Sequence, residues 1–313
     1  MVSFADRLRD AIDRKRSVVC VGLDPMPELF PPQLLPSPAD RGDLRDRLDA
    51  VYRFCQHVLE AVEPYAVAVK LQSACFEVFH GDGVDAYFSL VQEAAERGLL
   101  TIGDVKRGDI GTTSAAYAKA HLAPIDPELE GDGELATPDA ITVSPFLGLD
   151  TLEPFLAEAA AHGKGVFVLV RTSNPGSSLL QDAVLRDGRT LSESLADALA
   201  PIAEHYPAAC GWSQVGAVVG ATQPHTMASL RRRLPRSVFL LPGYGAQGAT
   251  ADMTREAFRG GPALVSASRS VLYAFRDARY AGLADYRQAI AHAARDMRDD
   301  LNRVVTLGGP AAV

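Results

Sequence analysis

Four charged residues carry the clearest chemistry in this sequence. Lys70, Asp104 and Lys106 end short apolar segments, and Asp109 follows Lys106 by three residues. Burying such side chains at the end of an apolar strand costs free energy, so a role for them is expected. Asp104 and Lys106 are two residues apart, so on a β-strand they project to the same face and can reach one substrate atom. With Lys70 on a neighbouring strand, the spacing predicts an alternating Lys–Asp–Lys–Asp array in which opposite neighbours keep every group charged.

The alternative is a buried ion-pair network that only joins strands. A single Lys–Asp pair would favour that structural explanation, because such pairs also occupy strand ends. Four charges at adjacent strand ends favour a reactive site instead. Asp24 ends the first apolar segment of the chain and is a further candidate for the same site.

A second group of residues lies in the last third of the chain. The glycine-rich segment 242–248, which contains Gln247, and the segment 268–270, which contains Arg269, follow the last two apolar segments. In β/α barrels these two loops commonly bind phosphate, with glycine N–H groups and a guanidinium fork as donors. A glycine-rich turn beside a rim arginine explains the pattern equally well. Ser173 could hydrogen-bond a heterocycle or could simply shape the turn before Pro175.

These residues need a scaffold that brings strand ends together. Short apolar, β-branched segments alternate with stretches of helical periodicity, which is typical of a parallel β/α architecture. Eight such segments predict a closed (β/α)8 TIM barrel. An open doubly wound sheet is the alternative, but it favours a G-x-G-x-x-G turn after the first strand, and residues 22–25 do not form one. The predicted strands are 17–24, 66–72, 100–106, 140–145, 165–172, 215–221, 238–243 and 263–269.

A chain of 313 residues can form one such domain, and we predict a single β/α-barrel domain over residues 1–313. Three segments rich in Pro, Gly, Ser or Asp are predicted as loop insertions near the strand ends, where barrel enzymes build their sites. The insertions are 25–43, 121–139 and 173–188. The predicted helices are 44–62, 84–96, 152–162, 191–205 and 286–304.

Composition argues against several classes of protein. The net charge is −8, from 31 basic and 39 acidic residues, so a nucleic-acid partner is not expected. The run 231–233, three arginines, is interpreted as favourable charge at a helix C-terminus. Four cysteines without C-x-x-C spacing indicate reduced cytoplasmic thiols. Charged residues interrupt every apolar run before it reaches the about 18 residues that a membrane span needs. The first 16 residues contain no apolar core typical of a signal peptide. The seven histidines show no metal-ligand spacing.

The segment 104–113 reads D-V-K-R-G-D-I-G-T-T and resembles the D-x-K-x-x-D-I-x-x-T signature of the orotidine 5′-monophosphate decarboxylase family. The resemblance extends along most of the chain. Residues 21–24 and 69–70 are similar to the first two strand ends of the family, 242–247 to its phosphate loop and 268–270 to its phosphate arginine. The long loops are similar to the bacterial subgroup with extended chains.

The resemblance implies a decarboxylase that needs neither metal nor organic cofactor. It implies that Asp24 and Lys70 hold the ribose hydroxyls and that Asp104 faces the substrate carboxylate. It implies that Lys106 protonates C6 of the pyrimidine as carbon dioxide leaves. A prepositioned ammonium would stabilise the developing carbanion and then quench it.

The resemblance also implies a homodimer with shared active sites. Asp109 and Thr113 would reach across the two-fold interface into the partner's site. Ser173 would contact the pyrimidine, and Gln247 with Arg269 would bind the phosphate. The product would be uridine 5′-monophosphate, formed in the last step of de novo pyrimidine nucleotide biosynthesis.

Two other functions remain open at this point. A magnesium-dependent sugar-phosphate decarboxylase or synthase of the same superfamily shares the D-x-K-x-x-D pattern. A catalytically idle barrel could bind a nucleotide or phosphate as a regulator, although such a binder has no use for a paired proton donor.

Overall fold

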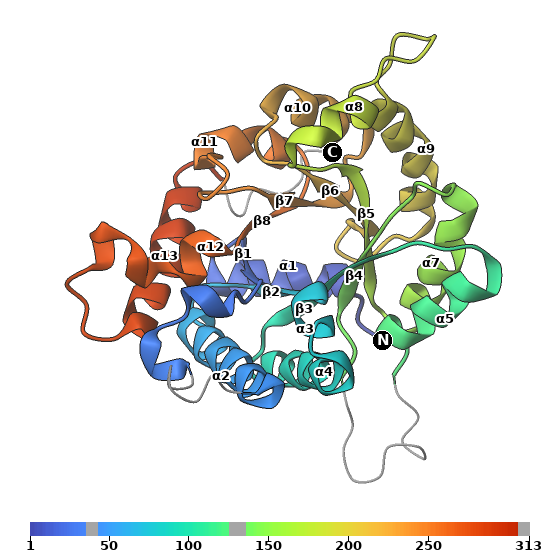
Figure 1. Cartoon of the computed structure of the whole chain (residues 1–313). Coiled ribbons are helices and arrows are strands. Elements are labelled where there is room, and N and C mark those ends of the chain that lie inside the picture. Colours follow the sequence, from blue (N-terminus) through green and yellow to red (C-terminus); the bar gives the residue numbers. More distant parts are fainter. Residues whose placement is uncertain (36–42, 125–135, 306–313) are drawn as a thin grey trace.

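The fold is a barrel of parallel strands whose order in the sheet follows their order in the chain. The strands are β1 Val19–Leu23, β2 Ala68–Gln72, β3 Leu100–Arg107, β4 Ala140–Val143, β5 Gly165–Arg171, β6 Ser213–Val219, β7 Ser237–Pro242 and β8 Ala263–Ala267. The computed structural model describes residues 1–35, 43–124 and 136–305. β1 pairs with both β2 and β8, so the sheet closes on itself (Figure 1). The predicted TIM barrel is confirmed.

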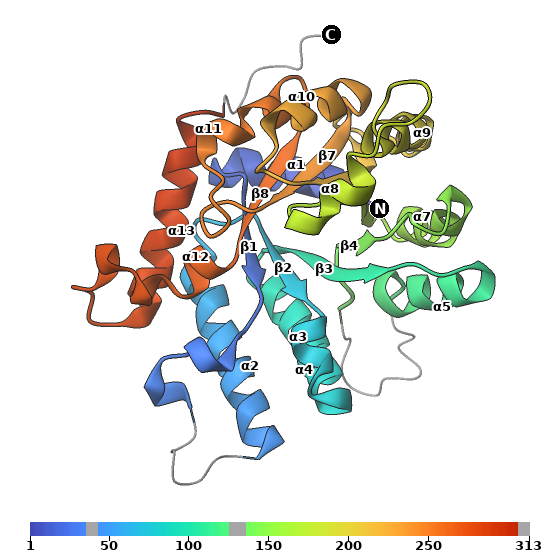
Figure 2. The same cartoon turned by 45° about the horizontal axis from the view of Figure 1, so that its top comes forward.

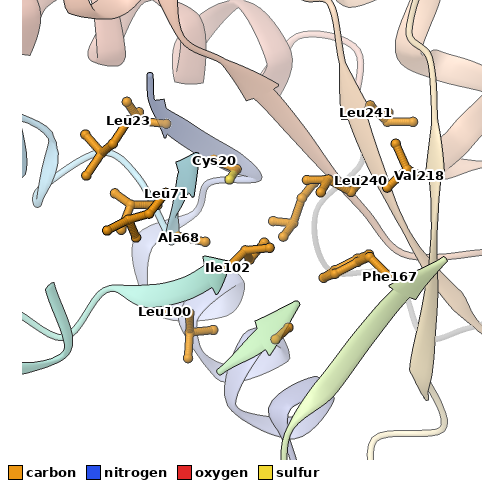
Figure 3. Packing of buried hydrophobic residues seen from close by; sticks show 14 of the residues in the cluster. Cys20, Leu23, Ala68, Leu71, Leu100, Ile102, Phe167, Val218, Leu240 and Leu241 are labelled. Carbon is orange, nitrogen blue, oxygen red and sulfur yellow. The ribbon is translucent and has the colours of Figure 1, made fainter. Parts of the chain in front are cut away.

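Burial on both faces explains why these segments form strands. Every residue of β1, β4 and β8 is buried. Inward-pointing side chains fill the barrel, and Figure 3 shows Ile102, Phe167 and Leu240 approaching one another from three different strands. Apolar side chains on the outer face pack under the helices. The almost continuous apolar pattern of each predicted strand therefore reflects two buried faces.

The longer helices surround the barrel, as the two views in Figures 1 and 2 show. These helices are α1 Phe4–Lys15, α2 Leu44–Val62, α4 His80–Glu96, α5 Gly111–Leu122, α7 Glu153–Ala161, α9 Leu191–His205, α10 Pro224–Arg233 and α13 Tyr286–Asn302. Short helices follow several strands. They are η1 Pro27–Leu29, η2 Pro32–Leu34, α3 Ala74–Glu77, η3 Leu149–Leu152, η4 Pro175–Ser177, α8 Ser178–Gln181, α11 Ala251–Thr254, η5 Arg255–Phe258, α12 Arg269–Leu272, η6 Ala274–Arg276 and η7 Ala278–Tyr280.

Helix predictions match the structure most closely where a capping box marks the start. α2 and α9 have the predicted bounds, and Asp43 and Thr190 form capping boxes at their N-termini. α4 begins at His80 rather than at residue 84, and α13 ends at Asn302 rather than at 304. α1 and α5 were not among the predicted helices.

Helix α1 closes the end of the barrel where the strands begin. Phe4 packs edge-on against Phe167, with ring centroids 5.9 Å apart. A side chain on Gly165, the first residue of β5, would place its Cβ 2.6 Å from the Phe4 ring, so only glycine fits under this helix. Lys15 donates from the other end of α1 to the Ala66 carbonyl, which precedes β2. α1 therefore spans the barrel as a floor (Figure 1).

The predicted insertions are described only in part. Residues 36–42 and 125–135 lie outside the described residues, so most of the predicted loop 121–139 and part of 25–43 cannot be compared. The segment 173–188 contains η4 and α8, and an antiparallel bridge between Val184 and Thr190 then makes a small hairpin before α9.

One member of the arginine run 231–233 has a role that the sequence did not show. α10 does end at Arg233, as a helix C-terminus was predicted there. Arg231, however, is only 2% exposed and donates to four main-chain carbonyls at the starts of β7 and β8 and beside them. Its guanidinium also lies 3.6 Å from the centroid of the Phe239 ring. The predicted charge at a helix C-terminus is confirmed, and Arg231 is in addition a structural tie, because its buried guanidinium has its donors satisfied.

Candidate active site

The centre of the site is the Asp104 carboxylate on β3. Its Oδ2 accepts hydrogen bonds from Lys70 Nζ at 2.6 Å and from Gln72 Nε2 at 3.0 Å. Its Oδ1 accepts from Lys106 Nζ at 2.6 Å and from Thr142 Oγ1 at 2.9 Å. Side chains from β2, β3 and β4 thus converge on one buried carboxylate, which explains how a charged group is kept at this depth.

The charges alternate in sign along a line through Lys70. Lys70 Nζ lies 2.6 Å from Asp104 Oδ2 and 3.6 Å from Asp24 Oδ1 at the end of β1. Lys70 and Asp104 are buried, whereas the Lys106 side chain is 46% exposed. The four-charge array predicted from the sequence therefore exists within one chain, but its second carboxylate is Asp24 and not Asp109.

The array fixes the protonation states of its buried members. Burial alone would raise the pKa of the Asp104 carboxyl, but the ammonium groups of Lys70 and Lys106 outweigh it and hold that pKa well below its usual range. Burial alone would lower the pKa of Lys70, but the carboxylates of Asp104 and Asp24 raise it above its usual range. Asp104 is therefore an anion and Lys70 a cation at neutral pH.

Lys106 owes its position to an irregular backbone. Its φ is 45°, in the left-handed region that non-glycine residues rarely adopt. The β3–β4 pairing shifts register between Gly103 and Arg107, so Lys106 lies in a bulge and not in a regular strand. The side chains of Asp104 and Lys106 meet as predicted, but simple strand alternation is not the reason. Such conformations cost about 1–3 kcal/mol and are typical of functional sites.

Asp109 and Thr113 lie beyond this cluster. Asp109 accepts a bond from the Ile110 main chain at 2.8 Å, and no ion pair involves it among the described residues. Thr113 is exposed in the first turn of α5. Within the described chain Asp109 therefore has no ion pair with Lys70 or Lys106, and its predicted role in the partner's site stays a prediction.

The loops after β5, β7 and β8 hold the remaining predicted residues at the same end of the barrel. Ser173 packs over the end of β6, where a Cβ on Gly220 would lie 3.1 Å from the Ser173 Cα. Gln247 and Arg269 are exposed. The Arg269 carbonyl accepts from the Tyr273 N–H at 3.2 Å, but the Arg269 guanidinium has no hydrogen bond or ion pair to any described residue, so its donors are open to a ligand.

The glycine-rich loop after β7 differs from the expectation of open N–H groups. The N–H groups of Gly245 and Gly248 donate to carbonyls of the same loop at 2.9 and 2.8 Å. Those of Ala246 and Ala249 also donate within the loop. The loop is thus folded onto itself, and these four N–H groups are not free to bind an anion in this conformation.

Comparison with known proteins identifies the family. The sequence model of the Orotidine 5'-phosphate decarboxylase / HUMPS family matches residues 17–282. The chain belongs to this family. It is 39% identical over 307 residues to the orotidine 5'-phosphate decarboxylase of Rhodopirellula baltica, which covers 96% of this chain and 99% of that one. The orotidine 5'-phosphate decarboxylase of Roseiflexus castenholzii is 38% identical over 96% of this chain and 98% of its own.

Solved structures agree with this assignment. The Leishmania donovani OMP decarboxylase superimposes with a TM-score of 0.70 at 30% identity, covering 97% of this chain and 99% of that one. Within the family, the charged cluster around Asp104 lies where β/α-barrel enzymes place their reactive groups, at the carboxyl ends of the strands.

Sequence reasoning missed three residues that contact Asp104 or the loop of Asp24. Gln72 and Thr142 bond Asp104 directly, and Tyr273 holds the loop that carries Asp24. Gln72 lies two residues after Lys70, so strand alternation could have placed it beside the cluster. Thr142 is one buried threonine among several, and only the bulge in β3 brings it to the site.

Other features of the described residues do not compete with this site. A groove of about 510 Å³ between α2 and α4 is lined by polar side chains such as Gln92 and Glu96 and lies outside the barrel. In the described ranges, no group of three or more His, Cys, Asp or Glu side chains could hold a metal ion. No described helix is both long and apolar enough to cross a membrane.

Proposed function

We propose that this chain converts orotidine 5′-monophosphate to uridine 5′-monophosphate and carbon dioxide, the last step of de novo UMP synthesis. The observation that carries the proposal is the line of alternating charges from Asp24 to Lys106, in a chain whose relatives are named orotidine 5'-phosphate decarboxylase. In the reaction the bond between C6 and the carboxylate breaks, and its electron pair stays on C6. The Lys106 ammonium then gives its proton to C6 and is reprotonated from solvent.

Electrostatics supply the catalysis in this proposal. The carbanion at C6 has no adjacent electron sink, so a fixed positive charge must stabilise it. Lys106 is suited to this because its ammonium is held 2.6 Å from Asp104 and does not need to reorganise during the reaction. Asp104 orients the ammonium through their hydrogen bond, and the Lys106 side chain is 46% exposed, so it is open to a substrate.

The remaining substrate contacts follow from open polar groups. Asp24 Oδ1 is buried without a hydrogen-bond donor, so it can accept a ribose hydroxyl beside Lys70. Arg269 and Gln247 would bind the phosphate, and Ser173 would contact the pyrimidine. Phosphate binding far from C6 contributes remote binding energy to the transition state.

A second copy of the chain completes the site in this proposal, with Asp109 and Thr113 reaching into the partner's barrel. The surface around them supports it, because large apolar side chains are exposed there. Ile110 is 63% exposed, and Phe146 and Leu147 on the adjoining loop after β4 are 79% and 52% exposed. Apolar residues gathered around exposed polar ones are typical of an interface.

Subunit mixing tests the shared site. Lys106→Ala and Asp109→Ala chains are each inactive alone, but an equal mixture should regain about a quarter of wild-type activity, because half of the dimers carry one intact site. Absence of any recovery in a mixture shown to exchange subunits would place both residues in the same chain's site.

A magnesium-dependent sugar-phosphate enzyme is the competing function. In such an enzyme a carboxylate equivalent to Asp104 would have to bind the ion, yet both Asp104 oxygens already accept two hydrogen bonds each. Binding a cation there would displace two ammonium groups. We therefore favour the decarboxylation of the nucleotide.

The decisive experiment is turnover of orotidine 5′-monophosphate in excess EDTA, followed by the loss of its ultraviolet absorbance and by release of carbon dioxide. We expect full activity under these conditions. Activity that requires added Mg²⁺, or no turnover by dimeric protein, would contradict the proposal. We further propose that the protein acts in the cytoplasm, as a single domain and without a cofactor. Its four cysteines are free thiols, as reducing conditions would keep them.

A further inference from the structure

We infer that Thr142 is a positioning residue for the decarboxylation, a role that rests on the function proposed above. Thr142 lies on β4 and is 1% exposed. Its Oγ1 is 2.9 Å from Asp104 Oδ1 and 3.0 Å from the main-chain nitrogen of Lys106. One hydroxyl therefore joins the central carboxylate to the backbone of the proton donor.

The direction of both hydrogen bonds is fixed by their partners. The Lys106 N–H can only donate, so Thr142 Oγ1 accepts from it. Asp104 is ionised and can only accept, so the Thr142 hydroxyl donates to it. Asp104 Oδ1 also accepts from the Lys106 ammonium at 2.6 Å. The three residues thus close a ring in which both ends of Lys106, main chain and side chain, are tied to the same carboxylate oxygen.

The bulge in β3 explains why a side chain, and not a main-chain carbonyl, accepts the hydrogen bond from the Lys106 N–H. Gly103 pairs with Ile141, and the next pair is Arg107 with Val143. Between these pairs β3 has three residues and β4 has only Thr142, so the regular ladder is interrupted there. The Thr142 hydroxyl supplies an acceptor for Lys106 inside the gap and supports its left-handed φ of 45°.

Removal of the hydroxyl has two consequences at once. Thr142→Val keeps the shape of the side chain but leaves the Lys106 N–H without this acceptor and takes one of four donors from Asp104. The strained conformation of Lys106 then loses a support, and the ammonium moves relative to C6. Thr142→Ser keeps the hydroxyl and loses only a methyl group, so the ring can still form.

The chain offers a matched control at the opposite end of the barrel. Thr101 is the second residue of β3, is also 1% exposed, and bonds Asp139 through its hydroxyl at 3.1 Å. It too accepts a main-chain N–H through Oγ1, from Asp139 at 3.1 Å. Thr101→Val therefore removes an equivalent buried hydroxyl from an equivalent pair of bonds, far from Lys106.

The test compares kcat and KM for orotidine 5′-monophosphate in the full-length variants. We expect Thr142→Val to lower kcat about 100-fold with KM within about threefold, because misplacement of a reacting group by about 1 Å costs that much. Thr142→Ser should stay within about threefold of wild type in both constants. Thr101→Val should keep kcat within about twofold of wild type. Its loss of thermal stability should be similar to that of Thr142→Val. A Thr142→Val enzyme with nearly wild-type kcat, or an equal loss of kcat in Thr101→Val, would overturn the inference.

A structural readout separates this inference from the proposed function. If the wild-type protein does not turn over the nucleotide, the proposed function fails, and the crystal structure of Thr142→Val then tests the positioning role directly. We expect Lys106 to leave the left-handed region or its ammonium to leave hydrogen-bonding distance of Asp104. An unchanged Lys106 and Asp104 would refute the role whatever the reaction is.

Discussion

Removal of the Lys70 ammonium should destabilise the protein far more than removal of the Lys106 ammonium, although both bond the same carboxylate. Lys70 Nζ lies 2.6 Å from Asp104 and 3.6 Å from Asp24. At an effective dielectric constant of about 20 these attractions are about 6 and about 5 kcal/mol. Desolvation of the buried ammonium offsets much of this, so Lys70→Met should cost about 3–5 kcal/mol of unfolding free energy.

Lys106→Met is the control for this prediction. Its side chain is 46% exposed, so solvent screens its charge, and the variant should lose about 1 kcal/mol or less. Urea unfolding at neutral pH measures both values, and calorimetry should show the Lys70 variant melting roughly 5–8 °C lower. Both variants should be inactive. Equal destabilisation by the two substitutions would refute the argument that burial of Lys70 sets the strength of this pair.

Three further predictions concern groups away from the reacting lysine. Burial lowers the pKa of His121 to about 4. The folded protein therefore keeps it neutral while the unfolded chain binds a proton below about pH 6.5, so stability should fall by about 2 kcal/mol from pH 7 to pH 5. Urea unfolding of His121→Phe should not show this loss of stability between pH 7 and pH 5. A variant with the same pH dependence as wild type would contradict the role of His121. Tyr273→Phe removes the hydroxyl that fixes the loop carrying Asp24 and should raise KM about tenfold with little change in kcat, whereas Tyr280→Phe should change neither constant. Arg231→Met removes a donor from four main-chain carbonyls, of which that of Pro262 keeps the Phe239 N–H, and should cost about 3–5 kcal/mol in urea unfolding, with kcat per folded molecule unchanged.

The barrel was predictable from the sequence because each strand is buried on both faces and so appears as an apolar segment. Helices were predictable where a capping residue precedes a regular apolar stripe, as at Thr190. α1 escaped because its charges were considered only as evidence against a signal peptide. Its buried residues Phe4, Leu8 and Ile12 nevertheless follow helical spacing.

The site was predictable only where residues end strands. Lys70, Asp104 and Lys106 were found in this way, and the structure brings them together. Asp24 was also found as a strand end, but its ion pair with Lys70 could not be foreseen, because the sequence does not show how the first two strands are aligned. The role of Thr142 depends on a register shift between two strands, which no periodicity of either strand reveals. Roles in substrate binding for Ser173, Gln247 and Arg269 stay predictions.

Helix α1 decides from which end of the barrel a ligand can enter. Phe4 packs against Gly165 and Phe167 at the opposite end, so in the described part of the chain the route to Lys106 passes the carboxyl ends of the strands. Under the proposed reaction, nucleotide and carbon dioxide leave by the same route, so the departing product clears the path for the next substrate. Met1 is 95% exposed on the closed side. A protein tethered to a solid support through its N-terminus would therefore keep the entrance to its active site facing the solution.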